Sequence, residues 1–152
     1  MANLDHEVWI NAPVATVYQA ISSAEGLSAW WAPHTATETD AGLVFAHHPG
    51  PEHGEVQMKV VELEPDRRVE LEVVSTHPKS SPASAWTGTH LVFEISEREN
   101  PGASRGVTDA SPHLTVLDFR HSGWDESSEY LGFCNFAWGQ VLMALQQWCE
   151  SK

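Results

Sequence analysis

The chain has 152 residues and a formal net charge of −13, from 21 acidic and 8 basic side chains. So few basic groups argue against nucleic acid as a partner, because phosphate backbones are bound mainly through lysine and arginine. Residues 1–10 have neither a basic start nor an apolar centre, so we predict no signal peptide and a cytoplasmic location. The length favours one domain over residues 1–152.

The first part of the chain predicts one strand followed by two short helices. Residues 4–10 alternate between apolar and polar side chains, which is typical of a half-buried strand. Asn11 can cap a helix over residues 13–21, which carries a proline just inside its start. The serines at 22–23 can begin a second helix that ends at Trp31, shortly before a proline.

Strand-like runs dominate the middle of the chain. They cover residues 43–47, 55–64, 67–76, 85–97 and 114–121. Turn signals separate them, at 49–51, at 65–66 and in the polar stretch 100–111. Short strands in succession, with turns and no long helix between them, predict an antiparallel sheet.

The last segment, residues 130–149, carries no formal charge. Its length is that of a membrane span, but one asparagine and three glutamines argue against that interpretation. Helical periodicity places Trp138, Leu142 and Leu145 on one broad apolar face. A second stripe, which lies opposite, contains Gly132, Phe136, Gly139 and Met143. An interior glycine costs about 1 kcal/mol relative to alanine, so we expect a close approach or a hollow beside this stripe.

Four segments together resemble one known family. They read INAPVATVYQAISSAEGLSAWWAP, WTGTHLVFEI, TVLDFRHSGW and FAWGQVLMAL. In this order they are similar to the SRPBCC superfamily, in the branch named after the heat-shock-protein-90 ATPase activator. The resemblance implies an α+β helix-grip (START-like) fold. In this fold a bent antiparallel sheet wraps around a long C-terminal helix, with two short helices after the first strand. It also implies a cavity between the sheet and that helix.

Side-chain alternation in the strands predicts which residues line such a cavity. The expected ligand-binding residues are Trp31, Met58, Leu71, Val73, Trp86, Leu91, Phe93, Leu117, Phe119, His121, Phe133 and Phe136. Most are apolar, so we expect an apolar small molecule or a lipid as the ligand, with no cofactor. Of the consecutive Trp30 and Trp31, one should enter the core, and the other should cover the cavity mouth or contact a partner. Trp86 and Trp124 are expected at the rim.

The nine histidines raise the questions of a metal and of acid–base catalysis. His47, His48 and His53 cluster around a loop, but adjacent strand residues point to opposite faces, and no zinc-ligand spacing is present. We therefore predict no metal site. His121, at the end of an inward strand face, is the candidate catalytic residue. The alternative is a buried histidine whose hydrogen bonds are satisfied within the fold.

Three classes of function remain open. The first is a binding domain for a hydrophobic small molecule. The second is a cyclase-like or hydrolase-like enzyme that uses His121. The third is a stress-related protein-interaction module, which would use Trp9, Trp31 or the Phe133 and Phe136 stripe and includes the case of a homodimer. The chain could thus be a monomer or a homodimer.

Overall fold

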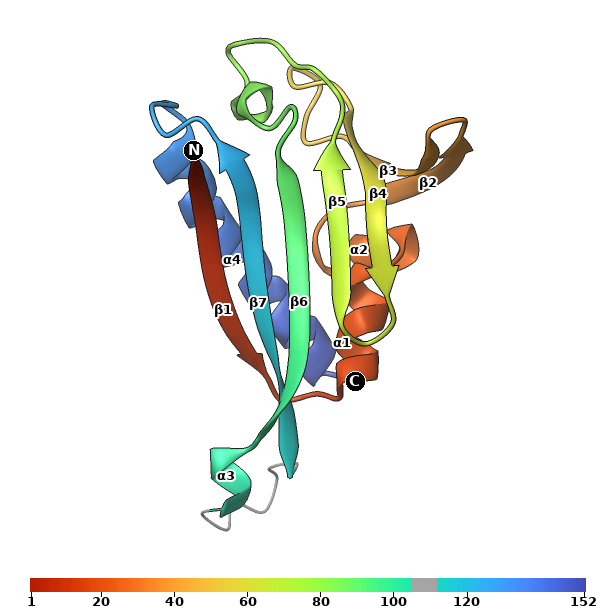
Figure 1. Ribbon diagram of the computed structural model, residues 1–152, viewed down its shortest axis with the longest axis vertical. Helices are drawn as coiled ribbons and strands as arrows, with labels where there is room; N and C mark the ends of the chain where they lie inside the picture. Colours follow the sequence, from red (N-terminus) through yellow and green to blue (C-terminus); the bar gives the residue numbers. More distant parts are fainter. Residues whose placement is uncertain (105–111) are drawn as a thin grey trace.

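The computed structural model describes residues 1–104 and 112–152, except for the side chains of residues 103 and 104. A bent seven-stranded sheet lies against one long helix (Figure 1). The elements in chain order are β1 (Ala2–Ile10), α1 (Val14–Ile21), α2 (Ala24–Trp30), β2 (His34–Thr39), β3 (Gly42–His47), β4 (Val56–Glu64), β5 (Arg68–Val73), η1 (Pro82–Ala85), β6 (His90–Glu99), α3 (Pro101–Ser104), β7 (His113–Trp124) and α4 (Leu131–Glu150).

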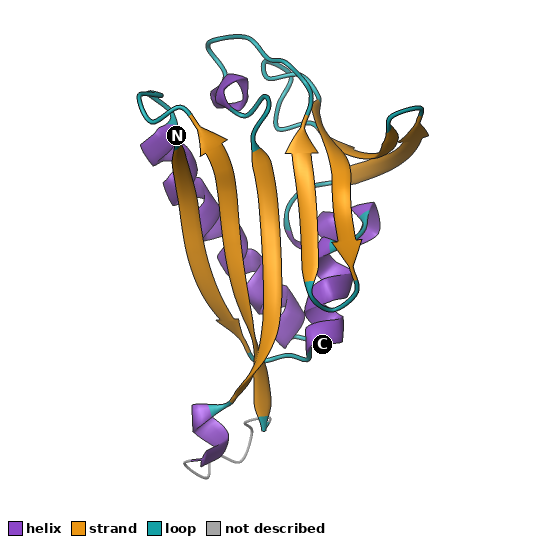
Figure 2. Ribbon diagram, in the orientation of Figure 1, coloured by secondary structure: helices purple, strands orange, loops and turns teal. Residues whose placement is uncertain are grey.

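All neighbouring strands of the sheet are antiparallel, in the order β1-β7-β6-β5-β4-β3-β2. The first strand therefore pairs with the last one, while the other strands follow one another as hairpins. Helices α1, α2 and α4 all lie on the same side of the sheet (Figure 2). This arrangement is the helix-grip fold, which confirms the fold class predicted from the sequence.

The core lies between the sheet and α4. Pairing of β6 with β7 sets Phe93 opposite Phe119, whose rings are 5.0 Å apart. Phe119 also contacts Trp138 of α4 at 4.4 Å between ring centroids. The buried residues of α4 itself repeat at helical spacing; they are Cys134, Trp138, Leu142, Leu145 and Cys149. The uncharged C-terminal helix therefore packs its apolar face against the sheet. No helix in the described parts of the chain is long and apolar enough to cross a membrane.

Two elements differ from the sequence prediction. Strand β2 was not predicted, because all of its residues except His34 are exposed and give no apolar alternation. The predicted strand over residues 85–97 begins only at His90. Before it, Pro82–Ala85 forms the single helical turn η1, in which the Ser81 hydroxyl accepts a hydrogen bond from the Ala83 N–H.

The helix starts are also informative. The N-cap of α1 is Pro13 and not Asn11, and no side chain caps this helix. Helix α2 begins as expected after a serine, because the Ser23 Oγ accepts a hydrogen bond from the Gly26 N–H. The predicted connector over residues 100–111 lies mostly outside the described residues, and its described start forms the short α3.

The close approach that glycine permits lies in α2 and not in α4. A Cβ atom at Gly26 would be 2.1 Å from the Gln19 carbonyl oxygen of α1. At Gly139 the nearest atom would be His6 Cε1 at 3.8 Å, and at Gly132 nothing would lie within 4 Å. A side chain at Gly132 would therefore face open space, and one at Gly139 would make a normal van der Waals contact. Gly26, in contrast, allows α1 and α2 to pack closely together.

A pair of glycine substitutions tests this difference. We expect Gly139→Ala to raise the free energy of unfolding by up to about 1 kcal/mol, because alanine is the better helix former. Gly26→Ala should lower it by about 1–3 kcal/mol, because the added methyl group collides with backbone. Urea denaturation followed by circular dichroism measures both. A Gly26→Ala protein as stable as the wild type would contradict the packing of α1 on α2.

Candidate functional site

An open pocket of about 300 Å³ lies beside the N-terminal half of α4. Its other walls are the loop between β3 and β4 and the segment around η1, which lie together at the upper end in Figure 1. The lining residues are Trp31, His47, Pro49, His53, Val56, Ser81, Pro82, Ala83, Trp86, Phe133, Cys134, Ala137, Trp138 and Val141. The volume is at the lower end of the range of about 300–1,000 Å³ that is typical of small-molecule sites.

Three tryptophans of the lining lie in contact with one another. The rings of Trp86 and Trp138 are stacked, with centroids 5.7 Å apart and planes at 18°. Trp31 lies 5.2 Å from Trp138 and 6.5 Å from Trp86. Such contacts between rings hold large flat surfaces in place. The pocket therefore offers a preformed aromatic wall to a flat apolar molecule.

A chain of hydrogen bonds behind this wall fixes two of the tryptophans. The Trp138 indole N–H donates to His121 Nδ1 at 3.0 Å. Because Nδ1 accepts, a neutral His121 carries its hydrogen on Nε2, which lies 2.7 Å from Thr89 Oγ1 and donates to it. The Thr89 hydroxyl in turn donates to the Trp86 carbonyl oxygen. His121 thus links the wall residues of α4 and of the η1 segment.

His121 is completely buried. Burial lowers its pKa from 6.5 to about 3, so the imidazole stays neutral at physiological pH. Both ring nitrogens are engaged, and the residue does not line the pocket. In this geometry His121 is a positioning residue for Trp86 and Trp138, and proton transfer to a molecule in the pocket would require the network to open.

The expected ligand-binding residues fall into three groups. Trp31, Trp86 and Phe133 line the pocket. Phe136 is 68% exposed and is not part of the lining. The sheet residues are enclosed in the core beneath α4, each with at most 1% of its surface exposed; they are Met58, Leu71, Val73, Leu91, Phe93, Leu117, Phe119 and His121. The pocket therefore lies at one end of the sheet, and not along its concave face.

The two consecutive tryptophans divide their roles. Trp30 is buried in the core and donates its indole N–H to the Ala20 carbonyl oxygen at 2.7 Å. Trp31 is half-buried and lines the pocket. Trp124, which was expected at the rim, is fully buried instead. It is the last residue of β7 and packs edge-on against the His121 ring.

Several lining residues were missed by the sequence interpretation. His47 is the clearest case, because it shares a strand face with the buried Phe45 and alternation could have placed it inside. Ser81, Pro82 and Ala83 precede a strand without any periodic signal, so only the folded chain brings them to α4.

The order Ser81, His53, Glu52 at the rim resembles that of a nucleophile, a base and an acid. The Ser81 hydroxyl is 2.6 Å from His53 Nδ1, and His53 Nε2 is 3.1 Å from Glu52 Oε1. However, Ser81 is 1% exposed, and its Oγ already accepts a hydrogen bond from the Ala83 N–H. We interpret these hydrogen bonds as structural. They connect the η1 segment to the loop after β3 and so shape the pocket rim.

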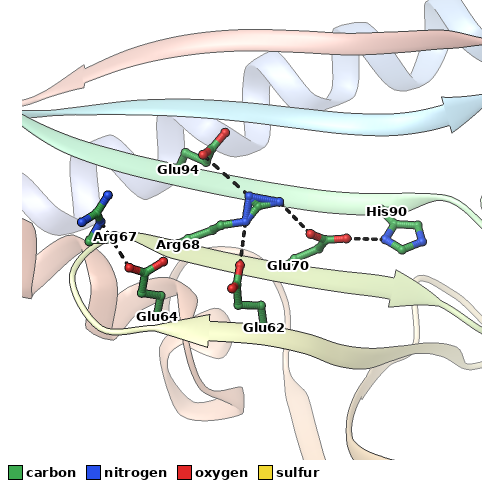
Figure 3. A network of polar contacts seen from close by, with 7 residues as sticks. All are labelled: Glu62, Glu64, Arg67, Arg68, Glu70, His90 and Glu94. Atoms are coloured by element: carbon green, nitrogen blue, oxygen red, sulfur yellow. Dashed lines mark hydrogen bonds and ion pairs between the residues drawn. The ribbon is translucent and has the colours of Figure 1, made fainter.

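The outer face of the sheet carries a network of charged side chains. Arg68 lies 2.8 Å from Glu62, 2.6 Å from Glu70 and 3.6 Å from Glu94 (Figure 3). His90 also contacts Glu70, at 2.6 Å. These side chains form ion pairs with one another, on the side of the sheet that faces away from α4. Within residues 1–104 and 112–152, no group of three histidine, cysteine, aspartate or glutamate side chains is placed to hold a metal ion.

Comparison with known proteins places this fold in a family. The profile described as "Activator of Hsp90 ATPase homolog 1-like protein" matches residues 11–150. The chain belongs to this family. A search of curated protein sequences found no match. The Activator of Hsp90 ATPase homolog 1-like family lies within the SRPBCC superfamily, as the sequence resemblance indicated. Membership of this family is consistent with a role as a ligand-binding module or as a protein-interaction module.

Solved structures of similar fold support the family assignment. A solution structure of the Aha1 dimer from Colwellia psychrerythraea is 25% identical, with a TM-score of 0.74, and the match covers 99% of this chain and 97% of that one. A crystal structure of a Mesorhizobium loti protein is 15% identical, with a TM-score of 0.72 and coverage of 99% and 98%. A Bacillus halodurans protein is 20% identical, with a TM-score of 0.68 and coverage of 99% and 98%. The last two comparisons concern the fold alone.

Proposed function

We propose that this member of the family binds a small, flat, mainly apolar molecule in the pocket beside α4. The observation that carries the proposal is the wall of Trp31, Trp86 and Trp138, held from behind by His121. If these rings served only to pack the protein's own core, no open volume would be needed beside them. Fixed aromatic rings around an open volume are a feature of sites for small ligands.

Narrowing the pocket tests this proposal. Naphthalene is a probe of suitable shape, and its binding can be followed through quenching of tryptophan fluorescence. We expect saturable binding to the wild type, because the probe can lie against the aromatic wall. Ala137→Leu should weaken this binding about tenfold, which corresponds to about 1.4 kcal/mol, because the larger side chain occupies the lining at α4.

The matched control is Gln140→Leu, which makes the same helix more apolar at an exposed position outside the pocket. It should leave the affinity for naphthalene unchanged. The proposed function would be refuted if neither naphthalene nor its derivatives 2-naphthol and 2-naphthoate gave saturable quenching in the wild type. Equal binding of naphthalene by the wild type and Ala137→Leu would also refute it.

Self-association is a second candidate function, favoured by the outer stripe of α4. Phe133, Phe136 and Met143 are 64%, 68% and 56% exposed. They lie within the run 130–149, which carries no formal charge although the chain has a net charge of −13. A second copy could approach this surface with less electrostatic repulsion than elsewhere. The Colwellia relative, described as a dimer in solution, supports this choice of partner.

Sedimentation velocity over a range of protein concentrations tests the dimer. We expect the wild type to dimerise, more strongly at high salt because salt screens the repulsion between two acidic chains. Phe136→Ser should be monomeric, since it removes the most exposed aromatic ring of the stripe. Val61→Ser, which changes an exposed apolar residue on β4, is the control and should still dimerise. A wild type that stays monomeric at every concentration would exclude this function.

A further inference from the structure

The pocket contains a buried polar residue without a partner. His47, the last residue of β3, lines the pocket and is only 4% exposed. Its ring lies 4.7 Å from that of Trp31 and 4.5 Å from that of His34. Within the described chain, neither of its ring nitrogens has a hydrogen-bond partner. Of the two, Nδ1 is enclosed and Nε2 is not. Since buried polar groups normally have partners, this one requires an explanation.

Unsatisfied polar atoms concentrate at this place. Five enclosed side-chain atoms lack a hydrogen bond within the described residues: His34 Nε2, His47 Nδ1, Arg68 Nε, Trp86 Nε1 and Trp124 Nε1. His47 and Trp86 line the pocket, and the His34 ring packs against His47. Of these, Trp86 has the Cys134 thiol, a weak acceptor, near its indole N–H, so His47 and His34 are the clearer cases. Arg68 is on the outer face and has the Glu62 carboxylate 2.8 Å away. Three of the five atoms therefore belong to the pocket or to its immediate support.

The charge of this group limits the partner. His47 is neutral, because burial above all, and then the nearby His34, His48 and His77, lower its pKa to about 3. His34 also stays neutral, since burial lowers its pKa. None of the described lining residues is a lysine or an arginine. A carboxylate or phosphate group buried here would thus have no counter-ion, which is strongly unfavourable.

A hydroxyl group matches what remains. A neutral imidazole has one donor and one acceptor nitrogen, and an O–H group can both donate and accept. Because Nδ1 of His47 is enclosed, the hydroxyl group is expected to meet Nε2, to which it can donate or from which it can accept, according to the tautomer. The aromatic wall meanwhile covers the apolar body of the same molecule.

We propose that the ligand is a neutral aromatic alcohol or phenol whose hydroxyl group forms a hydrogen bond with the His47 imidazole. This inference rests on the proposed ligand-binding function. It adds the chemical class of the ligand and names the residue that selects it. His47 is thus a specificity residue, whereas the tryptophans supply the apolar contact.

Three probes with the same ring system separate these contributions. They are naphthalene, 2-naphthol and 2-naphthoate, titrated at pH 7 into the full chain with tryptophan fluorescence as the readout. We expect 2-naphthol to bind about tenfold more tightly than naphthalene, as one net hydrogen bond allows. The anionic 2-naphthoate should bind more weakly than naphthalene.

Variants then assign the preference to His47. His47→Phe keeps a flat ring but has no nitrogen, so it should bind naphthalene and 2-naphthol equally. His48→Phe is the matched control, since the side chain of the adjacent His48 is 70% exposed, and it should keep the preference. If His47→Phe does not fold, nitrogen-15 NMR of the wild type replaces it. In that measurement 2-naphthol should shift a His47 ring nitrogen and naphthalene should not.

The outcomes distinguish the two levels of the argument. Equal affinity of the wild type for naphthalene and 2-naphthol overturns the present inference and leaves the pocket function standing. The same holds for a preference that survives in His47→Phe, for 2-naphthoate as the tightest ligand, or for a His47 signal that 2-naphthol does not shift. Failure of all three probes to bind the wild type overturns the proposed function itself.

Discussion

Replacing Trp138 with alanine is expected to lower the free energy of unfolding by about 3–5 kcal/mol. The indole is almost fully buried and contacts the rings of Phe119, Trp31 and Trp86. Its removal leaves a cavity between α4 and the sheet. It also leaves His121 Nδ1 as a buried acceptor without a donor. Such a loss is a large share of the roughly 5–15 kcal/mol that stabilises a typical domain.

Two further variants make this measurement specific. Trp138→Phe keeps most of the ring but loses the hydrogen bond to His121, so its cost should be well below that of alanine. Trp9→Ala removes a tryptophan that is 38% exposed on β1 and should cost much less. Urea denaturation at pH 7 gives all three values. A loss below about 1 kcal/mol for Trp138→Ala would show that this residue is not central to the core.

The helix of residues 131–150 could be predicted because its signal is local. One face repeats apolar side chains at helical spacing, and the absence of charge distinguishes the run from the rest of an acidic chain. Strand β2 could not be predicted in this way. Its side chains are polar and exposed, and only backbone pairing with β3 makes it a strand. Such pairing between strands leaves no periodic trace in an exposed sequence.

The position of the pocket was harder to predict than the fold. Alternation shows correctly that Leu71, Leu91 and Phe93 face inward, but it does not show whether space remains in front of them. Whether space remains depends on the volume of the side chains that enter from α4. The ring centroids of Phe119 and Trp138 are 4.4 Å apart, and these rings fill the middle of the fold. The mainly apolar open volume beside α4 lies instead where the irregular segment around η1 meets the helix. Irregular segments have no periodicity from which such a meeting could be inferred.

Acidification is expected to destabilise the protein steeply below about pH 6. His121 and His47 are enclosed, and burial lowers the pKa of each to about 3 in the folded state. In the unfolded chain their pKa is 6.5. Between these values the unfolded state binds a proton at each histidine and the folded state does not. The free energy of unfolding therefore falls as the pH falls, and the stabilisation is complete only above pH 6.5.

The size of this effect follows from the same two groups. Each contributes a slope of about 1.4 kcal/mol per pH unit, so together they remove about 5 kcal/mol between pH 6.5 and pH 4.5. Asp118 acts in the opposite direction, because burial and its neighbours Glu7 and Glu94 raise its pKa. Its side chain is exposed, however, so its contribution is small.

Urea denaturation at half-unit steps from pH 7.5 to pH 4.5 measures this slope. His121→Gln should reduce it by about half, because a glutamine amide can accept from Trp138 and donate to Thr89 but does not titrate. His113→Gln changes a histidine whose side chain is 56% exposed and should leave the slope unaltered. Equal slopes for the wild type and His121→Gln would mean that His121 is not the neutral, enclosed residue that holds Trp86 and Trp138 in place. In that case the aromatic wall of the pocket would need another source of rigidity.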